Sequence, residues 1–356
     1  MANKVEKNKK GYRLPFIPVM VLLSVLLIGT IFGASLVGSA KLGAGNAIRL
    51  LIAKLPFIGE LAGTKQIAPV YHTILYRVRL PRIMLAGLAG MGLSITGAAF
   101  QGLFRNPLAD PHILGVSSGA ALGATLGMLF GASGWFFGLS YIGVCALVGG
   151  LLTVLLVYRL AGSGTGMRTV HLLLTGTAVS SLLSAIISLL MTRHREQLEK
   201  IYMWTLGSFG SASWEKVLFL LIAVAAGTAS LLAFGRELNL IAAGEDTAKT
   251  LGVSMKKVRI GIILAGTLLV SACVSVSGII GFVGLIIPHC MRLIFGPDHR
   301  RLLPYAMVGG AVFMILCDTL ARTLTAPSEI PVGVVTSIFG APYFIFLLWR
   351  DKKKGM

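Results

Sequence analysis

Long apolar runs recur along the whole chain, separated by short segments rich in Gly, Pro and charged residues. Most runs approach the length of about 20 residues that a helix needs to cross a bilayer. The pattern predicts about ten membrane-spanning helices, at 14–37, 82–104, 112–130, 136–159, 169–192, 215–235, 258–277, 279–295, 302–322 and 331–349. We therefore expect an all-α polytopic membrane protein that forms one transmembrane domain over residues 1–356.

The composition supports a membrane protein. Hydrophobic residues make up 55% of the chain and charged residues only 13%, against roughly 25% charged residues in soluble domains. The 44 glycines suit helices that pack closely in lipid. Gly119, Gly123 and Gly127 lie along one face of the third predicted span and predict such a contact. Asn106 and Pro107 precede that span and predict a turn.

The formal net charge of +19 could indicate nucleic-acid binding. The Lys and Arg residues flank the apolar runs, however, and form no patch, so no nucleic-acid partner is expected. Most of them fall on the side that holds the basic tail at 1–13 and the loop at 236–257. The positive-inside rule then places both termini in the cytoplasm, with lipid around the spans.

The two halves of the chain share a weak similarity. Arg82 begins a predicted span that runs to the sequence Phe-Gln-Gly-Leu at 100–103, and Pro107 follows. Arg259 begins another span, which is followed by Phe-Val-Gly-Leu at 282–285 and by Pro288. Because the two spans enter from opposite sides, the similarity favours inverted-repeat-like halves, a common plan in transporters. Coincidence between Gly-rich apolar segments is the alternative.

Three groups of motifs appear in order over about residues 72–349. They are Arg79-Leu80-Pro81-Arg82 with Asn106-Pro107-Leu108-Ala109-Asp110-Pro111; Leu238-Asn239-Leu240 with Gly244-Glu245 and Leu251-Gly252-Val253; and Pro288-His289 with Arg292, Asp318, Arg322 and Glu329-Ile330-Pro331-Val332-Gly333. Together they resemble the FecCD-type permeases, the vitamin B12, haem and iron-siderophore class of ABC importers. The resemblance implies a permease that works with separate subunits.

The loop at 236–257 is the longest predicted cytoplasmic connection between spans. Its charged and apolar residues alternate at helical spacing, which predicts a short amphipathic helix pair. The resemblance implies that this pair docks on an ATP-hydrolysing subunit, through Asn239, Gly244, Glu245, Ala248, Leu251 and Gly252. A solvated connector is the alternative, but the apolar Leu251 favours docking.

Arg79, Arg82 and Arg322 stand at predicted helix ends on the outer side. The resemblance implies that they receive acidic residues of an extracytoplasmic substrate-binding protein, and a guanidinium suits a carboxylate because it binds in bidentate fashion. The alternative is that they reach lipid headgroups. Asp318 lies one turn before Arg322, and we interpret the two as a local pair that orients the arginine.

The resemblance also implies that the permease pairs with a second copy or a paralogue, and that a pathway forms between them. The fifth and tenth spans would line it, including Gly176, Ser180 and Ser184. We interpret Pro288, His289 and Arg292 as structural, since His289 has no acid or His one turn away. A haem ligand or a proton relay is the alternative for His289.

The energy source must lie outside this chain. No Gly-x-x-x-x-Gly-Lys-Ser/Thr motif occurs, so ATP and Mg²⁺ are expected on a partner subunit, and no cofactor on this one. The histidines and cysteines are dispersed, so spacing gives neither a metal site nor a nucleophile pair, and no enzyme activity is expected. The prediction is the permease of an ABC importer in the cytoplasmic (inner) membrane of a prokaryote, carrying an iron(III)-siderophore or a related chelate such as cobalamin or haem. An ion-coupled secondary transporter and a membrane-embedded enzyme are the alternatives.

Overall fold

A computed structural model describes residues 15–38, 43–53, 67–131, 134–136, 138–162 and 169–354. The basic tail predicted at 1–13 lies outside these residues. In the described part, helices are joined by turns and one two-stranded antiparallel ribbon, β1 (Trp135–Phe136) and β2 (Leu139–Ser140). The helices are α1 (Phe16–Leu36), α2 (Ala44–Ala53), α3 (Pro69–Thr73), η5 (Ile74–Arg79), α4 (Leu80–Leu103), η6 (Pro111–Leu114), α5 (Val116–Leu129), α6 (Tyr141–Leu160), α7 (Thr169–Arg193), η7 (Arg195–Gln197), α8 (Leu198–Thr205), α9 (Trp214–Ala233), α10 (Gly235–Ala243), α11 (Glu245–Thr250), α12 (Met255–Ser277), α13 (Val283–Phe295), α14 (His299–Ala321) and α15 (Val332–Lys354).

Seven helices of the described part are long and apolar enough to cross a membrane. They are Phe16–Leu36, Pro69–Leu103, Tyr141–Leu160, Val170–Arg193, Trp214–Ala233, Met255–Ser277 and His299–Ala321. Three shorter apolar helices, at Val116–Leu129, Val283–Phe295 and Val332–Leu347, occupy the other predicted spans. The protein is therefore a multi-pass membrane protein.

Two of the short helices replace spans that we predicted at 112–130 and 279–295. Before α5, the chain makes the 3₁₀ turn η6 and then passes through Gly115 at φ 82°. Before α13, Gly278 and Phe282 have φ of 71° and 70° and keep the intervening segment from continuing α12. Such irregular backbone is tolerated at membrane depth where protein surrounds it, and Pro111, Leu114, Gly278 and Ile280 lie close to or within the buried core.

The predicted start of the second span, at residue 82, is wrong. The helix runs without a break from Pro69 to Leu103, and one π-helical turn, η5, joins α3 to α4. The sequence suggested a helix end because Arg77, Arg79 and Arg82 follow each other closely. Residues 69–79 thus form the first turns of this helix, and α2 forms a separate short helix before it.

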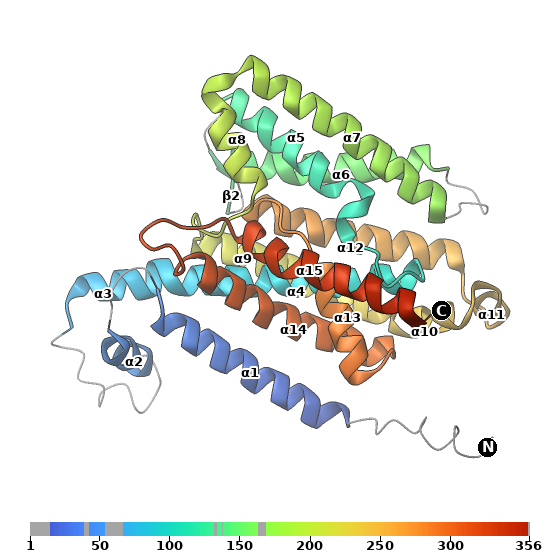
Figure 1. Ribbon diagram of the computed structural model, residues 1–356, viewed down its shortest axis with the longest axis horizontal. Coiled ribbons are helices and arrows are strands. Elements are labelled where there is room, and N and C mark those ends of the chain that lie inside the picture. The colour runs from blue at the N-terminus through green and yellow to red at the C-terminus, as the bar shows by residue number, and fades with distance from the viewer. Residues whose placement is uncertain are drawn as a thin grey trace.

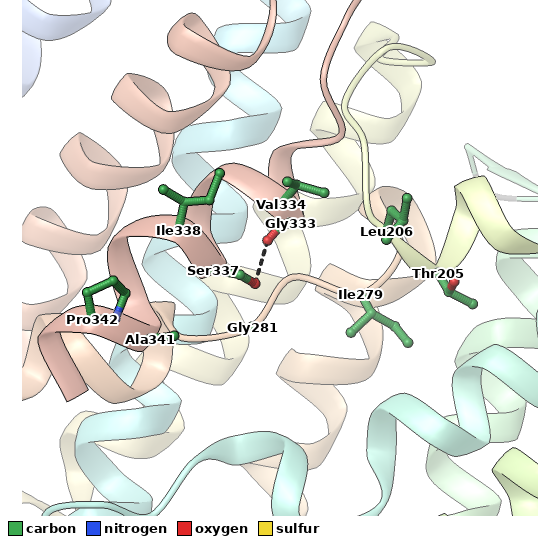
Figure 2. A pocket seen from close by; sticks show the side chains of 10 residues that line it. All are labelled: Thr205, Leu206, Ile279, Gly281, Gly333, Val334, Ser337, Ile338, Ala341 and Pro342. Atoms are coloured by element: carbon green, nitrogen blue, oxygen red, sulfur yellow. Dashed lines mark hydrogen bonds between the residues drawn. The ribbon is translucent and has the colours of Figure 1, made fainter. Parts of the chain in front are cut away.

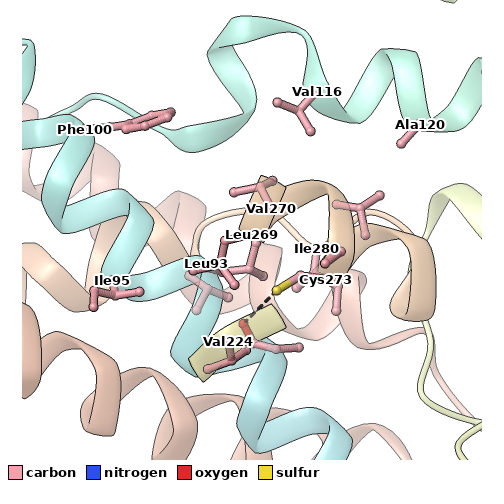
Figure 3. Packing of buried hydrophobic residues seen from close by; sticks show 14 of the residues in the cluster. Leu93, Ile95, Phe100, Val116, Ala120, Val224, Leu269, Val270, Cys273 and Ile280 are labelled. Carbon is pink, nitrogen blue, oxygen red and sulfur yellow. Dashed lines mark hydrogen bonds between the residues drawn. The ribbon is translucent and has the colours of Figure 1, made fainter. Parts of the chain in front are cut away.

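Helix α4 forms the centre of the fold, and α9, α12, α13 and α14 pack around it. Nearly every residue from Ile83 to Leu103 is buried. Figure 3 shows the core where α4 meets α12, with Leu93 near Leu269 and Cys273. Helices α5, α6 and α7 form a second group beside this centre, and α1 packs against α14 on the opposite side (Figure 1).

The helices run roughly along one direction, so the molecule has two ends (Figure 1). The short helices α10 and α11 lie at one end, which we call the α11 end. The turn around α3, the ribbon and α8 lie at the other, the α3 end. Helix α1 starts at the α11 end and α15 finishes there.

Candidate functional site

A hollow of about 690 Å³ opens along the N-terminal half of α15. Its walls come from Thr205 and Leu206 at the end of α8, from Ile279 and Gly281 before α13, and from α15 itself (Figure 2). The α15 residues are Gly333, Val334, Ser337, Ile338, Ala341 and Pro342. Ser337 donates its hydroxyl hydrogen to the Gly333 carbonyl at 2.7 Å. This polar side chain therefore has no hydrogen left to donate to a molecule in the hollow.

The small size of these residues has a structural cause. A Cβ on Gly333 would lie 3.0 Å from the Ile279 carbonyl oxygen, so α15 approaches the 279–281 segment backbone to backbone. The amide hydrogens of Val332 and Gly333 are donated to Gly207 and Leu206 at 3.0 and 3.1 Å. The start of α15 is thereby fixed to the turn after α8. The tenth predicted span thus lines a hollow, and its role as a pathway wall stays a prediction.

The three residues predicted on the fifth span do not line this hollow. Gly176 is buried, and a Cβ there would lie 3.3 Å from the Leu114 Cα, so it brings α7 onto η6. Ser180 faces the same contact, with its hydroxyl 3.2 Å from where a Cβ on Gly115 would be. Ser184 is exposed on α7. Gly176 and Ser180 thus pack α7 within the chain, and only Ser184 stays available to a pathway or to a second subunit.

At the α3 end, the guanidinium of Arg82 is enclosed by two carboxylates. Nε donates to Asp318 at 3.0 and 3.1 Å, and Nη2 donates to it at 2.9 Å. Nη1 donates to both oxygens of Glu329, at 2.8 and 2.9 Å. The Asp318 side chain is 1% exposed, whereas that of Glu329 is 38% exposed. Asp318 is therefore the inner partner of Arg82 and Glu329 the outer one.

Arg79 and Arg322 bind the end of α1. Arg79 Nη1 donates to the Ser35 carbonyl at 3.0 Å, and Arg322 Nη2 donates to the Ala34 carbonyl at 2.6 Å. These carbonyls belong to the last turn of α1, where no intrahelical donor reaches them. The two arginines satisfy them and place positive charge at the negative end of the helix dipole.

These contacts limit one prediction and extend another. The predicted docking role needs accessible arginines, but Arg79, Arg82 and Arg322 are 4%, 7% and 4% exposed. Asp318 does form the expected local ion pair with Arg322, at an Nε–Oδ2 distance of 3.8 Å, and it lies closer still to Arg82, at 2.9 Å. Burial favours short, multiple hydrogen bonds between opposite charges, which explains the enclosed geometry. The docking role of the arginines stays a prediction.

At the α11 end, α10 and α11 form the helix pair predicted over 236–257, and Gly244, at φ 139°, separates them. Asn239 turns inward. Its Nδ2 donates to Asp298 at 2.7 Å, and its Oδ1 accepts the His299 amide hydrogen at 2.8 Å. Ala248 is fully buried. Ala248, predicted to meet an ATPase, is thus covered by the chain itself, whereas Asn239 attaches the helix pair to the start of α14 and remains partly exposed.

Asp298 lies just before α14 and holds this junction. Burial alone would raise the pKa of its carboxyl. The hydrogen bonds from Asn239 and from the Arg300 amide, with the charges of Arg301 and Arg300, outweigh burial and keep the pKa below its ordinary value. The carboxylate therefore remains ionised at neutral pH and holds α10 against the start of α14.

The other residues of the predicted coupling surface differ in exposure. Leu251 is 57% exposed and Gly252 is also exposed, at φ 82°. Glu245 is partly exposed and lies 3.5 Å from Arg259 Nη2 at the start of α12. An exposed leucine beside a charged helix at the end of a bundle is suited to a protein contact. The surface carried by Glu245, Leu251 and Gly252 fits the predicted docking role best.

The residues predicted to be structural are in close contacts. A Cβ on Gly119 would lie 2.5 Å from the Gly149 carbonyl oxygen, and one on Gly127 would lie 3.2 Å from the Cys145 Cβ. A Cβ on Gly123 would overlap the Cys145 carbonyl. The three glycines therefore let α5 pack directly on α6. Asn106 accepts the Leu108 amide hydrogen at 2.9 Å and, with Pro107, makes the predicted turn.

Helix α13 is joined to its neighbours by polar contacts. Arg292 Nη2 donates to Gln101 Oε1 at 2.7 Å, and Gln101 Nε2 donates to the Leu285 carbonyl at 3.1 Å. His289 lies edge to face with Tyr343 of α15, with ring centroids 6.3 Å apart. Pro288 is buried within α13. These contacts agree with a structural interpretation of Pro288, His289 and Arg292.

One Ser–His pair was missed by sequence reasoning. Ser117, in a Gly-x-Ser-x-Gly spacing over 115–119, forms a hydrogen bond with His112 Nδ1. His112 Nε2 donates to the Ile280 carbonyl at 2.9 Å, so no carboxylate orients the ring as in a catalytic triad. The contact joins η6 to the 278–282 segment. Among the described residues, no group of three metal-binding side chains is found.

Comparisons with known proteins agree with this arrangement. The family model of the FecCD transport family matches residues 24–350. An uncharacterized ABC transporter permease protein of Bacillus subtilis is 45% identical, over 81% of this chain and 82% of the relative. A molybdate import system permease protein of Haemophilus influenzae is 39% identical, over 85% of this chain and 90% of the relative. A cobalamin import system permease protein of Halobacterium salinarum is 42% identical, over 79% of this chain and 74% of the relative.

The solved structures include a close match. A metal-chelate type ABC transporter in an inward-facing conformation aligns with a TM-score of 0.79 and 36% identity, covering 94% of this chain and 99% of the other. Both the sequence and the fold thus match along nearly the whole chain. The chain belongs to the FecCD transport family.

Proposed function

We propose that this permease subunit of an ABC importer moves a metal chelate across the cytoplasmic membrane of a prokaryote, driven by ATP hydrolysis in a separate subunit. The observation that carries the proposal is the 36% identity, over 94% of the chain, to a metal-chelate type ABC transporter. The candidate chelates are an iron(III)-siderophore, cobalamin and haem. One relative is a molybdate import permease, so molybdate is a further candidate and the substrate is to be identified by experiment.

We place the α11 end in the cytoplasm and the α3 end outside. The positive charge beside the loop at 236–257 supports this orientation. The three shorter apolar helices and the seven long ones together give ten passes. An even number of passes puts both termini on the same side of the membrane, here the cytoplasm. The exposed Leu251 then faces the compartment that holds ATP.

The assembly we propose contains two permeases, two ATPases and a substrate-binding protein. The permeases are identical copies or paralogues, and the hollow along α15 faces the pathway between them. The lining of this hollow supports the role, because it is mostly small or apolar and such a surface lets a bulky chelate pass without holding it. The substrate-binding protein docks at the α3 end, where a carboxylate from it exchanges with Glu329 on the outer side of Arg82.

The test is transport in proteoliposomes. The permease is reconstituted with its ATPase and binding protein, and uptake of labelled ferric siderophore, cobalamin, haem and molybdate is measured with ATP inside the vesicles. We expect uptake of one of these only with hydrolysable ATP. Uptake by the permease alone, or uptake that follows an ion gradient without ATP, would refute the proposal.

A further inference from the structure

A second cavity, of about 620 Å³, lies at the α3 end next to the hollow along α15. The two cavities share three segments of the chain. Trp204, Gly278 and Pro331 line the second cavity, and Leu206, Ile279 and Gly333, one or two residues further on, line the hollow. The second cavity therefore adjoins the outer part of the proposed pathway.

Lys216, in the first turn of α9, is the buried cation of this cavity. It is 6% exposed, and its Nζ donates to the Ser211 carbonyl at 2.9 Å and to the Ser211 hydroxyl at 2.7 Å. Nζ also lies 5.9 Å from the ring centroid of Trp135. Within the described residues it pairs with no carboxylate. Burying an ammonium without a counter-charge is costly, so a negative ligand would stabilise this arrangement.

Three hydroxyl groups of the cavity have hydrogens to donate, whereas Ser275 and Ser277 donate theirs to backbone carbonyls. Ser208 accepts from the Gly210 amide at 3.0 Å, Ser140 accepts from the Gly143 amide at 3.3 Å, and Ser211 accepts from Lys216. Within the described part of the chain, none of these three hydroxyls donates its own hydrogen. The ammonium and these three hydroxyl groups are all hydrogen-bond donors. An oxyanion carries several acceptor oxygens and can accept hydrogen bonds from such a set.

The other charged groups on the wall do not cancel this donor set. Glu329 lines the cavity, but both of its oxygens accept hydrogen bonds from Arg82. Arg322, paired with Asp318, supplies the second positive charge for these two carboxylates. Lys200 lies on the exposed part of the wall and adds a second positive charge. The mouth opens at Ser208 and Ser211, which are exposed, so an anion has access from the α3 end.

We propose that this cavity is a binding site for an oxyanion or a carboxylate, held by Lys216 with the hydroxyls of Ser208 and Ser211. The assignment of its ligand as a negatively charged group of the cargo rests on the proposed function. The site would receive this group at the outer mouth before the cargo reaches the hollow along α15.

The test is equilibrium binding to the purified transporter in phosphatidylcholine nanodiscs, at constant ionic strength with chloride as the background. Molybdate, phosphate and citrate are titrated calorimetrically, so that an inorganic oxyanion and a carboxylate are distinguished. We expect one saturable site per chain for at least one of them. Lys216→Met should weaken it about 10- to 100-fold, the loss expected for a charge-assisted hydrogen bond. Lys249→Met, at an exposed lysine of the α11 end, should bind as the unmodified protein does.

A second variant covers the case in which Lys216→Met fails to fold. Ser208→Ala with Ser211→Ala keeps the charge and should weaken binding about tenfold. The site would be overturned if none of the three anions bound saturably. It would also be overturned if both variants bound the anion as tightly as the unmodified protein. If anion binding is lost in nanodiscs that contain phosphatidylglycerol, the lipid headgroup competes for the site. That result would assign the site to lipid and overturn the cargo role. Anion binding without ATP-driven uptake would retain the site and refute the importer, whereas uptake without anion binding would refute only the site.

Discussion

Arg82 on α4 and Asp318 on α14 share three hydrogen bonds of 2.9–3.1 Å, although 236 residues separate them in the chain. Both side chains are buried. The pair joins the central helix to α14 at the α3 end, where Arg322 and Arg79 attach α1. One polar cluster therefore holds three membrane helices together at the α3 end.

Asp318→Asn should destabilise the protein strongly. It leaves Arg82 and Arg322 buried with less negative charge beside them, and removing one partner of a buried ion pair costs about 3–5 kcal/mol. The measurement is thermal unfolding in detergent, monitored by the labelling of the thiols of Cys273 and Cys317, which are buried in the folded protein. The control is Asp246→Asn, which breaks an exposed pair with Lys249 and should cost at most about 1 kcal/mol. Equal unfolding temperatures for the two variants would contradict the structural role.

Glu329→Gln should strengthen docking of the substrate-binding protein. The variant removes the charge that competes for Arg82 Nη1, while Asp318 keeps the guanidinium in place. Exposed charge pairs at an interface change affinity modestly, so we expect a Kd about three- to tenfold lower. The measurement is surface plasmon resonance with the cognate binding protein on nanodisc-embedded transporter. Glu215→Gln, at an exposed acid near the same end, is the control. An unchanged or higher Kd would show that Glu329 does not compete with the partner.

The helices were predictable from the sequence because apolar runs of membrane length leave little choice of structure. The partners of polar residues were not. Nothing near Arg82 in the sequence points to Asp318 or Glu329, since the contact forms only when α4, α14 and the start of α15 meet. Lys216 was overlooked for the same reason: what sets it apart is that it is buried and that, in the described part of the chain, it forms no ion pair.

The short helices at the α11 end show a second limit of sequence reasoning. The amphipathic pattern predicted that α10 and α11 exist, but a helix of six residues, such as α11, gives too few positions to decide which face is buried. Ala248 was assigned to the partner surface and is fully buried instead. The glycines of α5 were interpreted correctly because their spacing extends over more than two turns.

Leu251→Asp should detach the ATPase without unfolding the permease. The side chain is 57% exposed, so an aspartate there remains hydrated in the free permease but would be buried in an apolar contact. We expect loss of ATPase copurification and of uptake, with an unchanged unfolding temperature. The control is Lys256→Asp, an exposed change of charge at the nearby start of α12. Normal copurification and transport by Leu251→Asp would refute the coupling surface.

Gly123→Val should separate α5 from α6. The new side chain would overlap the Cys145 carbonyl, and backbone cannot move aside without breaking the helix contact. Overpacking of this kind costs about 1–3 kcal/mol, so the unfolding temperature should fall. Gly33→Ala on α1, where nothing lies within 4 Å of the added Cβ, should leave stability unchanged or slightly higher. A stable Gly123→Val variant would mean that the two helices do not pack as closely as described.

Ala341→Trp should block the pathway while leaving the motor active. Ala341 lines the hollow along α15 and points into it beside Gly281 (Figure 2), so an indole there fills space that the cargo needs. The coupling surface lies at the other end of the molecule, and the basal ATPase rate should therefore stay within about twofold of the original, less than 0.5 kcal/mol in the barrier. Phe346→Trp, on the same helix but outside the hollow, is the matched control and should transport normally. Both variants place an indole on α15, but only Ala341→Trp places it in the hollow. Normal uptake by Ala341→Trp would show that the cargo takes a route that avoids α15.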